Sequence, residues 1–255
     1  MSSKTLIIGS GRLATHLCHF FSLQKLPYDQ WNRHSDLSLE NLLDKSDRVL
    51  LAISDRAISD FITKNERILE GKTLVHFSAT VFDPRALGFH PLSSFSHDLC
   101  LDFSTIHFHG VHPESLFREA LPMFKNHYAQ LNAEDLRLYH ALCVVGGNFP
   151  ALLWKVFFTE MQKIGISDEA TKSYFNAVFK NIQSNPLQAA TGPLVRGDMA
   201  TIERNLDSLS EVNPNIARLY EAFVHAFAPQ FERGPEKTNN WPNDSVFNDE
   251  VAEDI

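Results

Sequence analysis

The sequence predicts an α/β fold in which a doubly wound parallel sheet is followed by an all-helical C-terminal domain. Three observations support this prediction. Short apolar runs alternate with amphipathic segments in the first half, which is typical of a parallel sheet covered on both faces. A glycine-rich turn directly follows the first apolar run. From residue 126 onward apolar residues recur at helical spacing, without a strand pattern of similar strength.

The first half supplies the strands of the predicted sheet. Four runs of apolar residues predict strands, at Leu6–Gly9, Tyr28–Trp31, Val49–Ile53 and Leu74–Phe77. The segments between them carry apolar residues at helical spacing and predict helices over 12–24, 39–45 and 56–65. A further strand is expected at 105–109, followed by a helix at 114–124.

The second half is expected to be helical. The periodic segments predict helices over 134–164, 168–183, 199–209 and 213–228. Pro150 should kink or split the first of them, because proline lacks the N–H of a helical hydrogen bond. The most apolar window, Ala141–Phe158, is interrupted by glycine, proline and lysine, and we expect a buried helix there rather than a membrane span.

These patterns divide the chain into three parts. We expect a dinucleotide-binding domain at 1–125, a helical substrate and dimerisation domain at 126–233, and a disordered acidic tail at 234–255. The net charge is −8, and the tail carries six acidic residues against one lysine. A mildly acidic body is a poor match for a phosphate backbone, so nucleic acid is not expected as a partner. The overall charge leaves open the alternative of a local basic pocket that binds one anionic ligand.

The cysteines and the N-terminus indicate the compartment. Cys18, Cys100 and Cys143 are odd in number and far apart, which favours buried thiols in a reducing compartment over disulfides. The apolar run near the N-terminus is too short for a signal peptide. We therefore expect a cytoplasmic protein.

The turn after the first strand carries the G-x-G-x-x-A pattern, in the residues Gly9, Ser10, Gly11, Arg12, Leu13 and Ala14. Gly9 permits a tight turn, Gly11 lets the backbone approach a pyrophosphate, and Ala14 lets helix and strand pack closely. The following helix would offer free N–H groups and its positive dipole end to the phosphates. This pattern, in the context of alternating strands and helices, predicts a dinucleotide site in a Rossmann fold. Its alternative is a glycine-rich turn in a fold that has lost its ligand.

The residues after the second strand favour NADP over NAD. An NAD site places a carboxylate there for the ribose hydroxyl, whereas an NADP site places a cation for the 2′-phosphate. Arg33 stands at this position, with Asn32 and Ser35 as further donors, and Asp29 lies too early in the strand. A solvated surface arginine is the alternative. Ile53 and Ser54 at the end of the third strand, together with Ser78 after the fourth, complete the predicted cofactor site.

Several segments resemble a known family. They are Gly9–Leu17 with Asn32 and Arg33, then 73–79 (TLVHFSA), 88–95 (GFHPLSSF), 139–150 (YHALCVVGGNFP) and 191–198 (TGPLVRGD). Together they resemble Rossmann-like NADP oxidoreductases without a settled substrate, whose C-terminal half is a domain of unknown function. These are distant relatives of pyrroline-5-carboxylate reductase and of the 6-phosphogluconate and β-hydroxyacid dehydrogenases. The resemblance covers about residues 4 to 210.

The resemblance implies an NADP-binding N-terminal domain and a helical C-terminal domain, similar to that of 6-phosphogluconate dehydrogenase, which often forms a homodimer. It also implies that the 191–198 turn lies where pyrroline-5-carboxylate reductase holds its substrate near the dimer interface. The chain departs from the β-hydroxyacid dehydrogenases at Val144, where those enzymes place a catalytic lysine. That lysine's role therefore has no counterpart here.

Polar residues at the expected sheet edge are candidates for the chemistry of hydride transfer. Ser78 and Ala79 end the fourth strand, where ligands of open α/β sheets bind, and Ser78 could touch the nicotinamide or the substrate. A turn-forming serine is the alternative. His90 precedes a proline, which fixes its backbone, and histidine suits a general acid near neutral pH. The alternative for His90 is a structural histidine.

The helical half contributes further candidates. His140, Val144 and Asn148 would share one helical face, with His140 as a second proton donor and Asn148 orienting a substrate carbonyl. A buried amide at the Pro150 kink is the alternative for Asn148. In the 191–198 turn, Thr191, Gly192 and Arg196 are candidates for binding substrate, Arg196 as a fork for a carboxylate or phosphate. Asp198 is better explained as the cap of the next helix.

No metal site is predicted. His107, His109 and His112 could in principle ligate zinc, and the first two would share a strand face. No cysteine or carboxylate partner has ligand spacing. The sequence therefore favours an NADP(H)-dependent oxidoreductase acting on a small, anionic carbonyl, imine or hydroxy compound. The alternative is a sensor or scaffold that binds NADP(H) without turnover, and the missing lysine favours it.

Overall fold

A computed structural model describes residues 4–99 and 101–231 of the chain. The chain divides into two compact units, Met1–Phe157 and Phe158–Ile255, each of which is described here by itself. This division by compactness differs from the change of sequence texture at residue 126. Cys100 and the acidic tail expected at 234–255 lie outside the described residues.

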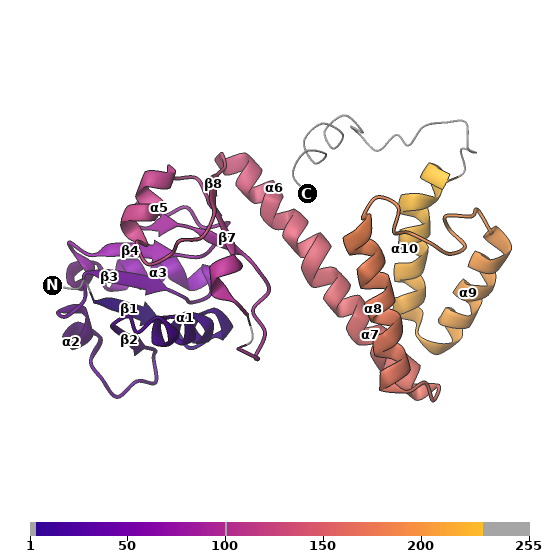
Figure 1. Ribbon diagram of the computed structural model, residues 1–255, viewed down its shortest axis with the longest axis horizontal. Helices are drawn as coiled ribbons and strands as arrows, with labels where there is room; N and C mark the ends of the chain where they lie inside the picture. Colours follow the sequence, from indigo (N-terminus) through magenta and orange to yellow (C-terminus); the bar gives the residue numbers. More distant parts are fainter. Residues whose placement is uncertain (1–3, 100, 232–255) are drawn as a thin grey trace. The chain divides into compact units, whose positions relative to one another are not determined.

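The first unit is built on a parallel sheet, as the sequence predicts, which has a fifth strand, β5, in addition to the four expected ones. Its strands are ordered β2-β1-β3-β4-β5, with bounds β1 Thr5–Ile8, β2 Tyr28–Trp31, β3 Arg48–Leu51, β4 Thr73–His76 and β5 Leu87–Gly88 (Figure 1). The chain moves from β1 to β2 in one direction along the sheet and returns to add β3 on the other side of β1. Such a reversal opens a crevice at the carboxyl ends of the two strands beside it, here β1 and β3.

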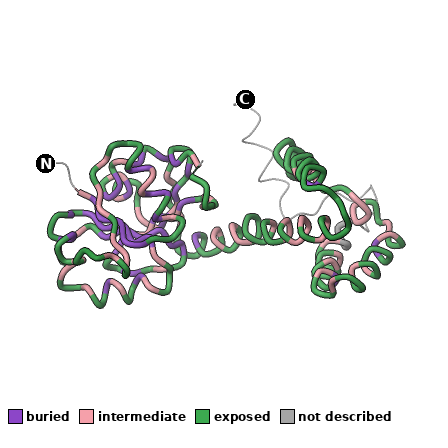
Figure 2. The backbone as a smooth tube through the Cα atoms, turned by 90° about the horizontal axis from the view of Figure 1, so that it is seen from below, coloured by how far each residue is buried: buried purple, intermediate pink, exposed green. Residues whose placement is uncertain are grey.

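Helices cover both faces of this sheet. Residues of α1 (Arg12–Leu23) and α5 (Glu114–Ala120) share one buried cluster with Ile7, Leu50 and Val75. Residues of α2 (Leu39–Leu43), α3 (Asp55–Lys64) and α4 (Glu66–Leu69) share the other with alternate residues of the same strands. Figure 2 shows this buried layer running through the first unit. The strands are apolar on both faces because both faces are covered.

A second, three-stranded sheet extends the first unit. It is ordered β6-β7-β8, with β6 at His90–Leu92, β7 at His107–Gly110 and β8 at Tyr128–Gln130, and a 3₁₀ turn at Phe103–Thr105 precedes β7. The strand expected at 105–109 is β7, whereas β5, β6 and β8 were not expected. The expectation that no strand follows residue 126 is therefore wrong, because β8 lies beyond it. Strands of two or three residues are too short for a periodic pattern, and pairing alone establishes them.

The helix expected at 134–164 forms in three pieces. They are α6 (Ala133–Cys143), a π-helical turn η2 (Val144–Asn148) and α7 (Phe149–Lys163). The predicted interruption near Pro150 is confirmed, and the π turn lies where the missing proline N–H disturbs the hydrogen-bond ladder. Because a π turn inserts an extra residue, the i, i+4, i+8 spacing of His140, Val144 and Asn148 does not keep them on one α-helical face.

The expectation that the helix over Ala141–Phe158 is buried is wrong, because much of its apolar surface is exposed in the chain. Leu142, Val145, Phe149 and Leu152 are all more than half exposed. By length and composition the stretch Ala133–Lys163 meets the requirement for a membrane span, and none of its most apolar window is buried. An exposed apolar surface of this kind on a helix marks an interaction site.

The second unit is helical, as predicted. It contains the end of α7 together with α8 (Asp168–Ser184), α9 (Met199–Val212) and α10 (Pro214–Phe231). Ser167 and Asp198 cap α8 and α9, since their side chains accept hydrogen bonds from the backbone N–H groups of Ala170 and Thr201. The predicted capping by Asp198 is thus confirmed. The rings of Phe158 and Phe175 join α7 to α8, with centroids 6.4 Å apart.

Candidate dinucleotide site

The turn between β1 and α1 has the backbone that the glycine pattern predicts. Gly9 has φ +131°, and a Cβ atom there would lie 2.2 Å from the carbonyl oxygen of Ala52 at the end of β3. Only glycine fits so close to the neighbouring strand. Gly11 precedes α1 with open space around its Cα, and Ala14 is fully buried in the core beneath. The turn thus leaves the N-terminus of α1 accessible to a ligand.

A groove of about 830 Å³ lies at this turn, at the carboxyl ends of β1, β2 and β3. It is lined by nine of the predicted cofactor residues, namely Gly9, Ser10, Gly11, Arg12, Leu13, Asn32, Arg33, Ile53 and Ser54. Ala14 packs below it. Ser35 supports the groove from behind, since its Oγ accepts a hydrogen bond of 2.9 Å from the backbone N–H of Asn32. Ser78 does not line the groove.

The groove is basic although the protein is acidic. Four cationic side chains line it, Arg12, Arg33, Arg56 and Lys64, against the single carboxylate of Asp60. Sequence reasoning missed Arg56 and Lys64, whose positions in the first and last turns of α3 were the available signal. Such a cluster suits a ligand with several negative charges.

The groove has no carboxylate from β2. Asp29 instead forms an ion pair of 2.6 Å with Lys4. Asp29 is not among the residues that line the groove. A hydrogen bond of 3.1 Å from Arg33 Nε to His34 Nε2 leaves the guanidinium exposed beside the groove.

Ser78 has a different setting from the one predicted. Its Oγ donates a 2.7 Å hydrogen bond to Asp55 Oδ2, and the Thr80 hydroxyl donates to the same oxygen at 3.0 Å. The backbone N–H groups of Thr80 and Val81 donate to Ser78 Oγ, each at 3.1 Å. This network ties the loop after β4 to the N-terminus of α3. Asp55 was missed by sequence reasoning, although it directly follows the predicted residues Ile53 and Ser54.

His90 and His140, predicted as proton donors, lie together, with ring centroids 5.5 Å apart. Between them Tyr139, which sequence reasoning missed, places its Oη 3.0 Å from His90 Nδ1. Burial, with smaller contributions from His140 and His109, lowers the pKa of His90 to about 4. Burial also raises the pKa of Tyr139.

These pKa values change the role of His90. A ring with this pKa is neutral near pH 7, which argues against the expected role of His90 as an imidazolium acid. A neutral tyrosine–histidine pair can still pass a proton through the hydrogen bond between its members.

The other histidines do not form a metal site. His107 stacks on His127 with centroids 4.9 Å apart, and His109 packs against Tyr139. Nδ1 of His109 is buried and has no hydrogen-bond partner among the described residues. Within the part of the chain that the structure describes, no three histidine, cysteine, aspartate or glutamate side chains are placed to hold a metal ion.

The remaining predicted residues lie on the helical elements. Asn148 is exposed in the π turn η2, and no hydrogen bond or ring contact among the described residues joins it to the histidine pair. Thr191, Gly192 and Arg196 belong to the second unit and form the turn before α9. Gly192 has φ +101°, and the backbone N–H of Arg196 donates to its carbonyl oxygen at 3.4 Å. The Arg196 side chain is exposed.

The parallel sheet, its switch point and the groove define a Rossmann-like NAD(P)-binding fold followed by a helical region. Comparison with known proteins agrees with this assignment. Residues 113–227 match a family model described as a domain of unknown function, DUF2520. The chain therefore carries a DUF2520 domain after its N-terminal sheet. The comparison with curated protein sequences gives no match.

Solved structures share the fold over most of the chain. A protein from Bacteroides fragilis described as a putative NADP oxidoreductase has a TM-score of 0.74 at 19% identity, covering 89% of this chain and 98% of its own. Protein TM1727 from Thermotoga maritima has a TM-score of 0.62 at 20% identity, covering 88% and 97%. Pyrroline carboxylate reductase from Plasmodium falciparum, solved with NADP bound, has a TM-score of 0.55 at 12% identity, covering 90% and 98%. The fold is thus shared with NADP-dependent oxidoreductases.

Proposed function

We propose that the protein is an NADP(H)-dependent oxidoreductase that transfers hydride to or from a small, anionic carbonyl, imine or hydroxy compound. The observation that carries the proposal is the basic groove at the β1–α1 turn. The N-terminus of α1 and Arg12 would bind the pyrophosphate, and Arg33 would bind the 2′-phosphate of NADP. NADP supplies the hydride chemistry when bound.

The cofactor part is tested by calorimetric titration with NADPH and NADH. Arg33→Ala should weaken NADPH binding about 10- to 100-fold and leave NADH binding nearly unchanged, because a charge-assisted hydrogen bond contributes about 1.5–3 kcal/mol. The matched control is Arg67→Ala, which removes an exposed arginine outside the groove. Equal affinities of the wild-type protein for both cofactors would refute the preference for NADP, and no binding of either would refute the proposal.

The proton part rests on Tyr139 and His90. In the reducing direction Tyr139 would give its hydroxyl proton to the substrate, while the Nδ1–H tautomer of His90 would donate a hydrogen bond to the Tyr139 oxygen and stabilise the phenolate that forms. His140 packs edge-on against His90 and fixes the pair from the other side. Asn148 and the turn with Thr191, Gly192 and Arg196 are proposed to bind the substrate, and the guanidinium of Arg196 suits its anionic group.

Turnover is tested by following NADPH oxidation against a panel of small carboxylated ketones and imines. Tyr139→Phe and His90→Gln should lower kcat about 100-fold, as expected for loss of general acid–base catalysis, without changing the Kd of NADPH. His107→Gln, on the neighbouring strand, serves as the control. Tight NADPH binding without turnover of any member of the panel would favour the alternative, a sensor or scaffold, which the valine at position 144 also favours.

We further propose that the protein acts as a homodimer in the cytoplasm, without nucleic acid or membrane partners. The exposed apolar surface of α6 and α7 supports a second copy as the partner of the helical domain. Cys18 and Cys143 carry free thiols, which supports a reducing compartment.

A further inference from the structure

A second cavity, of about 240 Å³, lies at the carboxyl ends of β4 and β5 and shares no lining residue with the dinucleotide groove. We call it the β4–β5 cavity. Its polar lining comes chiefly from His76, Ser78 and His112, and its apolar lining includes Val81, Phe82 and Leu136. The proposed function does not use it.

His76 presents a hydrogen-bond donor that has no partner in the protein. The ring is 1% exposed, and its Nδ1 accepts a hydrogen bond of 3.3 Å from the backbone N–H of Ser78. A nitrogen that accepts from an amide carries no proton, so the proton of the neutral ring is on Nε2. The structure gives Nε2 no hydrogen bond to any of the residues that it describes. This N–H is accessible from the cavity that His76 lines, so a ligand in the cavity can accept a hydrogen bond from it.

Gly88 fixes the position of this ring. A Cβ atom at Gly88 would lie 2.6 Å from His76 Cε1 and 3.0 Å from Nε2, so any larger residue would displace the histidine. Burial lowers the pKa of His76 to about 4, and the ring is therefore neutral at pH 7. The protein thus holds a neutral imidazole, in one tautomer and one place, in the lining of the cavity.

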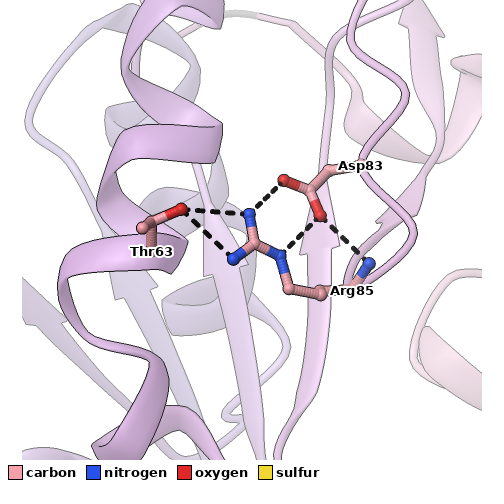
Figure 3. A network of polar contacts seen from close by, with 3 residues as sticks. All are labelled: Thr63, Asp83 and Arg85. Atoms are coloured by element: carbon pink, nitrogen blue, oxygen red, sulfur yellow. Dashed lines mark hydrogen bonds and ion pairs between the residues drawn. The ribbon is translucent and has the colours of Figure 1, made fainter.

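The cavity offers no free charge. Asp83 is the one carboxylate in its lining, and Arg85 neutralises it through hydrogen bonds of 2.9 Å from Nε and 2.8 Å from Nη2 (Figure 3). The guanidinium is held on its other side by the Thr63 hydroxyl, 3.2 Å from both terminal nitrogens. The Arg85 guanidinium also lowers the pKa of Asp83 well below its usual range. Within the lining no cation is free to pair with an anionic ligand, since Arg137 lies outside it, so the interior of the cavity suits an uncharged ligand.

The size and the mouth of the cavity limit the ligand further. A volume of about 240 Å³ corresponds to about eight water molecules, the size of a single substituted ring. Phe82 is 41% exposed, and the guanidinium of Arg137 lies 5.1 Å from its ring centroid. Phe82 belongs to the lining and offers an apolar face to a ring that enters, whereas Arg137 lies outside the lining.

We propose that the β4–β5 cavity is a binding site for a small, uncharged molecule with an apolar ring, which accepts a hydrogen bond from Nε2–H of His76. The ring of the ligand packs against Val81, Phe82 and Leu136.

The test uses the full-length protein with ¹⁵N-labelled histidine rings and benzamide as the probe. Benzamide should bind saturably and shift the His76 Nε2 resonance, also in saturating NADPH, because the cavity and the groove share no residue. Benzoate has the same shape with a negative charge, and ethylbenzene lacks the acceptor, so both should bind at least about tenfold more weakly. No shift at His76, equal binding of either analogue, or displacement of benzamide by NADPH would overturn the proposal.

Two variants separate the two nitrogens of His76. His76→Asn keeps an acceptor near the Ser78 amide but removes the donor at Nε2. This variant should bind benzamide about tenfold more weakly than the wild-type protein. His76→Gln places an amide N–H near the Nε2 position, and its affinity for benzamide should stay within about threefold of that of the wild-type protein. His107→Asn, outside the cavity, is the control. Unchanged benzamide binding in His76→Asn would overturn the proposal, and the ring resonances of the wild-type protein decide the question if that variant does not fold.

Discussion

Two buried histidines should make the first unit sensitive to mild acid. The pKa values of His76 and His90 are lowered to about 4 in the folded protein, in both cases chiefly by burial, from the ordinary value of 6.5. Between pH 6.5 and 4 the unfolded chain therefore binds protons that the folded protein excludes. Stability from these groups is fully present above pH 6.5 and is lost as the pH falls toward 4.

The magnitude follows from proton linkage. For a pKa that falls from 6.5 to about 4, lowering the pH from 7 to 5 removes about 2 kcal/mol per histidine, or about 4 kcal/mol for both. This is a large fraction of the about 5–15 kcal/mol that holds a typical domain folded. Carboxylates whose pKa values are lowered in the folded state, such as Asp83 and Asp102, titrate below this window and do not obscure it.

Urea unfolding followed by circular dichroism at pH 7, 6 and 5 measures this loss. His76→Gln and His90→Gln should each reduce the loss between pH 7 and pH 5 by about 2 kcal/mol, because neither variant has an imidazole to protonate. His97→Gln, at an exposed position, tests whether removal of any histidine has this effect. A wild-type stability that is constant from pH 7 to 5, or an undiminished loss in both variants, would refute the reasoning.

Three further predictions concern the turn, the core and the helices. Gly9→Ala should lower the free energy of unfolding by more than about 3 kcal/mol, because of positive-φ strain and the clash with Ala52. Gly11→Ala should change it by less than about 1 kcal/mol, and urea titration of both variants compares them. Asn126→Ala should cost about 2–4 kcal/mol in the same assay, because the buried Nδ2 donates to the carbonyl oxygens of three residues, and a smaller loss would mean that water replaces it. Leu152→Lys should convert the proposed dimer into monomer in light scattering, and a dimer that persists would place the interface elsewhere.

Much of the first unit was predictable because its signals are local. The G-x-G-x-x-A turn, the four apolar strands and the helix after each of the first three depend on residues close in sequence, and the structure places them within a few residues of the expected bounds. Nine of the predicted cofactor residues line one groove because they lie at the carboxyl ends of three neighbouring parallel strands, β1, β2 and β3, which share one edge of the sheet. The helices of the second unit were predictable for the same reason, since periodicity over more than ten residues is a strong signal.

The sequence by itself determined the first four strands, the dinucleotide turn and the order of the helices, because short-range periodicity and turn chemistry specify them. Only the tertiary structure decided that Tyr139 meets His90, that Asp55 binds Ser78, and that His76 lines a cavity at the ends of β4 and β5. The first of these pairs is separated by 49 residues and the second by 23, and no local pattern records such distances. The exposed apolar helix belongs to the same group, since hydrophobic composition shows that a surface seeks burial but not against what it is buried.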